Sequence, residues 1–197
     1  MVSGYFGATT PAIHELFRTR FGWIAIMLLL NVIPWVAIAV KDNPVLGVTA
    51  LVVDGLVAGI ALSPILYFAS VVNPTLILAA LMVTGAVFLA VSGYVMTSGR
   101  TFSAPRGLMI GLLVSITVGI VLNMFLNIGV LGLLISVAIG AFGVFSLVYS
   151  TSTVLNSPDS TSPIPGALML FSGLFNVFNS VLNILLRLFG GGGGRRD

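Results

Sequence analysis

Residues 75–96 read TLILAALMVTGAVFLAVSGYVM and contain no charged side chain. About 20 consecutive apolar residues are what an α-helix needs to cross a bilayer, whereas a membrane β-strand needs only about ten. A segment surrounded by lipid must also satisfy its own backbone hydrogen bonds, which a helix does. This stretch therefore predicts a transmembrane helix.

Similar apolar segments recur along the whole chain, separated by charged residues or by Pro- and Gly-rich breaks. They lie at 22–40, 45–71, 75–96, 106–127, 129–150 and 164–189. Of the 197 residues, 58% are hydrophobic and only 7% are charged, against roughly 25% charged in soluble domains. We expect an all-α, multi-pass bundle of about six spans over 22–189, with an N-terminal segment at 1–21 and a flexible Gly-rich tail at 190–197.

Composition also narrows the function. The eight Lys and Arg residues form no dense basic patch, so nucleic acid is not an expected partner. The chain has no Cys, a single His (His14) and few carboxylates, which leaves no metal cluster, catalytic triad or carboxylate pair. We expect neither enzymatic activity nor a bound cofactor. The lipid bilayer is the expected partner, and a plasma membrane is the default location because long soluble loops are absent.

Small residues and prolines indicate how the helices pack and bend. Four-residue spacing, which lets helix backbones approach closely, relates Gly55 to Gly59 and relates Gly111, Ser115 and Gly119. Pro34 and Pro64 lie inside predicted spans, where each removes a backbone hydrogen bond and can kink the helix. Such a kink can be a packing feature without any further function.

Asp54 is the one acidic residue inside a predicted span. It lies about nine residues from Val45, or roughly 13 Å along a helix. An ionised carboxylate at this depth costs at least about 2.5–3.5 kcal/mol, so such residues usually face the bundle interior and often mark ion or proton paths. The alternatives are a protonated packing residue, or a span that begins later and leaves Asp54 near the headgroups.

The last segment has a polar stripe, a name used below for six residues at helical spacing. They are Ser172, Asn176, Asn179, Ser180, Asn183 and Arg187. At 100° per residue they fall within an arc of about 100°. A one-sided stripe in an apolar helix predicts either the wall of a hydrated cavity or hydrogen bonding to neighbouring helices. A helix lying in the membrane interface is a third interpretation, although such helices are usually rich in Lys and Arg.

Four stretches resemble motifs of the Bax inhibitor family. In order they are LVAGIALSPI at 56–65, with Ser63 and Pro64 in a Gly-Leu-Ser-x-Pro-Ile type of motif, VFSLVYST at 144–151, ALMLFSGLFNVF at 167–178 and LLRLFG at 185–190. The resemblance covers about residues 50–190, and it depends mainly on the order and spacing of the motifs. It implies a bundle whose last, polar helix is surrounded by the others, and a pH-sensitive calcium leak with Ca²⁺ as the transported ion.

The sequence differs from the family pattern at two important positions. The family has two facing carboxylates; Ser150 replaces the first, and the second corresponds to Gly173, Asn176 or Val177. None of these side chains titrates, so the paired acids that would make a latch sensitive to pH are missing. The family also usually has seven segments where this chain has room for about six.

Orientation in the membrane stays open. For six spans, five Lys and Arg residues lie on the side of the termini and three on the other side, which favours termini inside. The family pattern instead places the loop with Arg100 and Arg106 inside.

Two functional hypotheses follow. In the first, the chain is a cation leak whose pathway candidates are Asp54, Ser150, Asn176, Asn179, Asn183 and Arg187. In the second, it is a non-transporting scaffold or partner-binding subunit, in which the polar stripe holds helices together. Whether the polar stripe faces water distinguishes the two.

Overall fold

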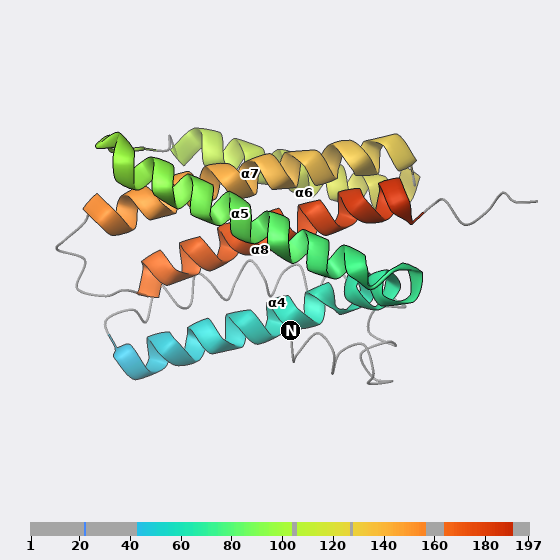
Figure 1. Ribbon diagram of the computed structural model, residues 1–197, viewed down its shortest axis with the longest axis horizontal. Coiled ribbons are helices and arrows are strands. Elements are labelled where there is room, and N and C mark those ends of the chain that lie inside the picture. The colour runs from blue at the N-terminus through green and yellow to red at the C-terminus, as the bar shows by residue number, and fades with distance from the viewer. Residues whose placement is uncertain (1–21, 23–42, 104–105, 127, 157–163, 191–197) are drawn as a thin grey trace, which may run out of the picture. The chain divides into compact units, whose positions relative to one another are not determined.

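The computed structural model describes residue 22 and residues 43–103, 106–126, 128–156 and 164–190 (Figure 1). Five helices lie in these ranges: α4 (Pro44–Val72), α5 (Thr75–Ser98), α6 (Arg106–Leu126), α7 (Gly129–Asn156) and α8 (Ile164–Phe189). They coincide with five of the six predicted segments. The predicted first span at 22–40 and the N-terminal segment lie outside the described residues except for Gly22, and so does the tail except for Gly190.

Four of these helices are long and apolar enough to cross a membrane. Their mean hydropathies are 2.3 for α4, 2.3 for α5, 2.4 for α7 and 1.6 for α8. In α6 the apolar stretch found within the described residues is the shorter Val114–Asn123. The all-helical membrane architecture is therefore confirmed, while the number of six spans stays a prediction.

Residues at the helix ends explain where α4 begins and stops. Asn43 caps its first turn, because the Asn43 side-chain oxygen accepts hydrogen bonds from the backbone N–H groups of Val45 (3.1 Å) and Leu46 (3.2 Å). At the other end Asn73 is extended, and Pro74 follows it. Because the residue before a proline avoids helical backbone angles, the chain breaks here before α5 starts.

α7 continues to Asn156, six residues beyond its predicted end at 150. Residues 152–165, rich in Ser and Pro, were expected to form the connection to the next segment. Polar side chains at this end of α7 instead hydrogen-bond to their own helix. Ser150, Thr153 and Asn156 donate to carbonyl oxygens four residues back, at Ser146 (2.7 Å), Tyr149 (2.9 Å) and Ser152 (2.8 Å).

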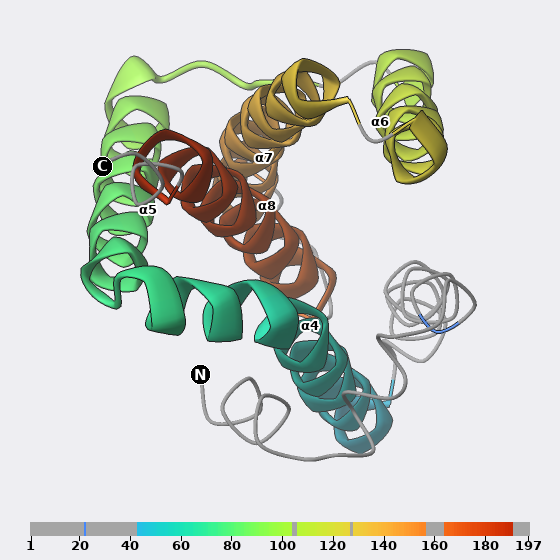
Figure 2. The same cartoon turned by 90° about the vertical axis from the view of Figure 1, so that its right-hand side faces the viewer.

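The helices belong to two compact units. In the first unit, α4 contacts the first turn of α8. Ile164 and Leu168 are 5% and 4% exposed and pack against Ala50 and Leu51. α4 contains Pro64, and Figure 2 shows that this helix changes direction along its course. A proline inside a helix is a sufficient cause for such a bend.

The second unit contains α5, α6, α7 and the part of α8 from Met169 onward. α5 and α6 both contact α7, and α7 and α8 lie side by side (Figures 1 and 2). Among the four candidate spans α8 has the largest buried share, 33%, against 28% for α7 and 17% for each of the others. The most polar span is therefore the best covered one.

Candidate functional site

The interface between α7 and α8 is built on glycines. A Cβ atom added at Gly143 would lie 2.9 Å from the backbone nitrogen of Val177 and 3.0 Å from the Cβ of Asn176. One added at Gly140 would meet Ser180, and one added at Gly132 would meet the guanidinium of Arg187. Residues later in α7 thus meet residues earlier in α8, so the two helices pack antiparallel. Their backbones lie close together because glycines stand at the contacts.

The contact is reciprocal. On α8, a Cβ added at Gly173 would lie 2.8 Å from the Cγ of Leu147, which is fully buried on α7. Ser136 of α7, four residues before Gly140, is also buried. The small residues of α7 therefore form a close-packing face, defined as Gly132, Ser136, Gly140 and Gly143. Faces of this kind let membrane helices gain van der Waals contact and interhelical hydrogen bonds.

Two members of the polar stripe hydrogen-bond to the backbone of α7. The Ser180 hydroxyl donates to the carbonyl oxygen of Ser136 at 2.6 Å, and both residues are buried. The Arg187 guanidinium donates through Nη1 to the carbonyl oxygen of Gly129 at 3.0 Å. The stripe therefore ties α8 to α7 near its middle and at its C-terminal end.

The asparagines of the polar stripe are half-buried. Asn183 donates through Nδ2 to Asn179, both to its carbonyl oxygen at 2.9 Å and to its Oδ1 at 3.0 Å. The Cβ of Asn176 faces Gly143. Ser172 is the exposed member among the stripe residues between Ser172 and Asn183. Three of the six stripe residues, Asn176, Ser180 and Arg187, thus contact α7.

Of the four positions that the resemblance matches to the family's carboxylates, Ser150, Gly173 and Val177 are buried and Asn176 is half-buried. Ser150 is fully buried, and its hydroxyl donates within α7 to the carbonyl oxygens of Ser146 (2.7 Å) and Leu147 (3.2 Å). Gly173 and Val177 pack against α7, and Val177 is 2% exposed. These positions are occupied by tightly packed groups without a titratable proton.

Asp54 belongs to the first unit, on α4, and is 5% exposed. Its burial fits a carboxyl group that faces protein rather than lipid. Ser63, further along the same helix, is 1% exposed and donates to the carbonyl oxygen of Ile60 at 2.6 Å. Within the described residues no three His, Asp or Glu side chains come together as a metal site.

The small-residue pairs singled out in the sequence occupy more open surroundings. A Cβ added at Gly55 or at Gly111 would meet nothing within 4 Å, and Ser115 is exposed. Gly119 is the exception, because its added Cβ would lie 3.3 Å from Ile135 of α7. Gly59 is half-buried.

Sequence reasoning missed the close-packing face of α7. The signal was present, because Gly132, Ser136, Gly140 and Gly143 follow one another at spacings of four, four and three. In a chain with 23 glycines, spacing alone does not separate a packed face from an open one. Whether a glycine face is packed or open depends on the helix that lies against it.

We expect Gly143→Ala to lower the free energy of unfolding by about 1–3 kcal/mol, because the new methyl group would press on the backbone of Val177. The matched control is Gly55→Ala, whose methyl group meets open space. That variant should be as stable as the parent or slightly more stable, since Ala favours a helix over Gly by about 1 kcal/mol. Unfolding of the purified protein by SDS, followed by circular dichroism, measures both values. Equal effects of the two substitutions would contradict the packing described here.

Comparisons with known proteins agree with this architecture. The family model described as inhibitor of apoptosis-promoting Bax1 matches residues 1–190. An uncharacterized protein of Neisseria meningitidis serogroup A is 34% identical over 147 residues, which cover 73% of this chain and 64% of the relative. An uncharacterized membrane protein of Vibrio cholerae is 35% identical over 138 residues, 68% of this chain and 60% of the relative.

A third relative has a functional name. The modulator of FtsH protease YccA of Escherichia coli K12 is 30% identical over 102 residues, 52% of this chain and 46% of the relative. The matched regions cover 64%, 60% and 46% of the length of these three relatives. With the family model covering nearly the whole chain, and with four helices suited to a membrane, the chain belongs to the Bax inhibitor family of integral membrane proteins.

Proposed function

We propose that this chain is a partner-binding protein of the plasma membrane that modulates a protease of the FtsH type and catalyses no reaction itself. The main support for the proposal is that residues of the polar stripe hydrogen-bond to the neighbouring helix α7. The Ser180 and Arg187 side chains donate to backbone carbonyls of α7. They hold two helices in one arrangement, as the second hypothesis from the sequence requires.

A fixed helix pair suits a protein that presents a surface to a partner. Binding to a preorganised surface loses less conformational entropy than binding to a mobile one. Large apolar side chains cover the outer faces of the described spans, including Met82 (63% exposed), Leu89 (71%) and Val130 (70%). A partner with its own membrane helices can pack against such faces in competition with lipid.

The relatives supply the chemical class of the partner. The Escherichia coli K12 relative is named as a modulator of FtsH protease, and its counterpart in Escherichia coli O6 is named as an inner membrane protein. The similarity to the former covers 52% of this chain. A modulator role and a plasma-membrane location both follow from this relationship as proposals.

Reconstitution tests this function directly. Purified chain and purified FtsH-type protease are placed together in nanodiscs, and degradation of a fluorescent membrane-protein substrate is followed. We expect the degradation rate to change in proportion to the amount of chain until a complex is saturated. Gly143→Leu, which forces α7 from α8, should lose the effect, whereas Gly55→Leu should keep it. An unchanged rate at tenfold excess of the chain, with no complex on size exclusion, would reject the proposal.

A cation leak is the second candidate, because Asp54 is a carboxyl residue buried within a membrane helix. In this reading Ca²⁺ crosses the membrane through the chain. The pathway candidates are Asp54 in the first unit and, in the second, Ser150, Asn176, Asn179, Asn183 and Arg187. The resemblance to the family suggests the ion. The engagement of Ser180 and Arg187 in helix packing favours the first candidate.

Calcium flux into proteoliposomes distinguishes this candidate from the first. If the chain is a leak, Asp54→Asn should slow the flux about tenfold, which corresponds to a barrier higher by about 1.4 kcal/mol. Ser70→Ala is the matched control on α4, since Ser70 is exposed and donates only to the carbonyl oxygen of Tyr67 in its own helix. The leak is refuted if flux equals that of empty liposomes or ignores Asp54→Asn.

A further inference from the structure

A short segment crosses the end of the α5–α7 pair. α5 ends at Ser98, and Gly99 turns the chain with a φ of 59°, in the left-handed region that favours glycine. Residues 99–103, called the strap below, then leave the axis of α5. Phe102 joins the strap to the helices through two contacts, one with α7 and one with α5.

Phe102 makes these two contacts. Its backbone N–H donates to the Ser152 hydroxyl of α7 at 2.8 Å, across 50 residues of sequence. Its ring lies 5.7 Å from the ring of Tyr94, centroid to centroid, so the strap also folds back on α5. The Asn156 side chain approaches the same Ser152 hydroxyl at 3.4 Å. Ser152 is thus the point where the strap, α7 and its last turn meet.

Burial changes abruptly at this point. Leu155 is 45% exposed and Asn156 is exposed, whereas Ser152, one turn earlier, is 2% exposed. The two residues before Ser152 are also buried, because Thr151 is 7% exposed and Ser150 is 0% exposed. The boundary between exposed and buried side chains at this end of α7 therefore lies next to Ser152, the residue that the strap contacts.

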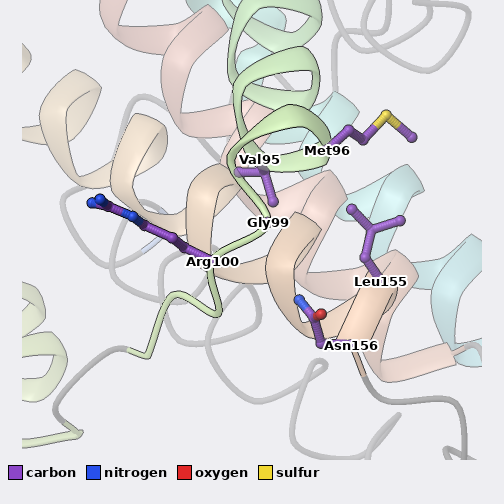
Figure 3. Close-up of a pocket in the computed structure, with 6 residues that line it drawn as sticks. All are labelled: Val95, Met96, Gly99, Arg100, Leu155 and Asn156. Atoms are coloured by element: carbon purple, nitrogen blue, oxygen red, sulfur yellow. The ribbon is translucent and has the colours of Figure 1, made fainter.

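An open pocket lies on the accessible side of this boundary. Its volume is about 230 Å³, and it is lined by Val95, Met96, Gly99, Arg100, Leu155 and Asn156. Figure 3 shows that these residues come from the end of α5, the strap and the end of α7, and that the Arg100 side chain points away from the other five. The pocket therefore borders the last turn of α7.

Near this end of the two helices, two hydroxyl groups have no hydrogen-bond partner. They are Oγ1 of Thr151 on α7 and Oγ of Ser92 on α5, and both atoms are buried. A buried hydroxyl without a partner is unfavourable, and a water molecule would satisfy it. Access to water would therefore favour these two groups.

We propose that the strap is a water-excluding closure of the α5–α7 end, and that release of Phe102 from Ser152 admits water to Thr151 and Ser92. The Ser152 hydroxyl holds the closed state. The unpartnered hydroxyls favour the open state, in which water can hydrogen-bond to them. This device does not depend on whether the chain modulates a protease or conducts an ion.

Cysteine accessibility tests the closure, because the chain contains no natural cysteine. Thr151→Cys is prepared in nanodiscs, where a charged methanethiosulfonate reagent reaches both membrane faces. We expect slow modification in this background, and modification about tenfold faster after the further change Ser152→Ala, which removes the acceptor for Phe102. Ser152→Thr keeps a hydroxyl and should restore the slow rate.

Controls separate opening of the strap from general loosening. Ser136→Cys is also buried on α7 but lies four turns from the strap, so Ser152→Ala should leave its rate unchanged. Ser103→Cys is exposed and should react fast in every background. If Ser152→Ala impairs folding, Phe102→Ala removes the ring contact instead and should also speed modification at position 151. A rate at position 151 that stays within twofold in both variants, or that rises equally at position 136, would overturn the proposal.

Discussion

The close approach of α7 and α8 is the interaction on which the second unit depends. In lipid the hydrophobic effect does not draw helices together, because the tails are as apolar as leucine. Contact between backbones must supply the attraction, and it requires positions without side chains. Gly132, Gly140 and Gly143 provide them on α7, and Gly173 provides one on α8. Hydrogen bonds from Ser180 and Arg187 then fix the register of the pair.

Much of the fold could be predicted, because the determining signal is local. An apolar run of about 20 residues bounded by Pro, Asn or charge defines a helix whatever its neighbours are. The end of α7 could not be placed this way, since the Ser- and Pro-rich stretch from Ser152 onward resembles a connection, and yet Thr153 and Asn156 hydrogen-bond back to their own helix. Whether such a side chain starts a loop or hydrogen-bonds to its own helix depends on its burial, which a single sequence does not show.

The candidate site was predicted only in outline. Helical spacing revealed that Ser180 and Arg187 share a face of α8, but the groups they bond to are backbone carbonyls, which leave no trace in a sequence. The same limit explains why the open Gly55 and the packed Gly143 looked alike. Asp54 was identified by charge alone, and its 5% exposure agrees with the inference that it faces protein.

Disulfide trapping between α7 and α8 tests the central claim most directly. In a chain without cysteine, Gly140→Cys is combined with Ser180→Cys; the Cβ positions are 3.1 Å apart, just below the roughly 3.5–4.5 Å of a natural disulfide. The packing predicts rapid cross-linking by a mild oxidant in native-like membranes. The neighbouring pair Ala141→Cys with Ser180→Cys should stay reduced, because Ala141 is exposed on the outer face of α7. Failure of the first pair to cross-link, or equal cross-linking of both pairs, would contradict the account.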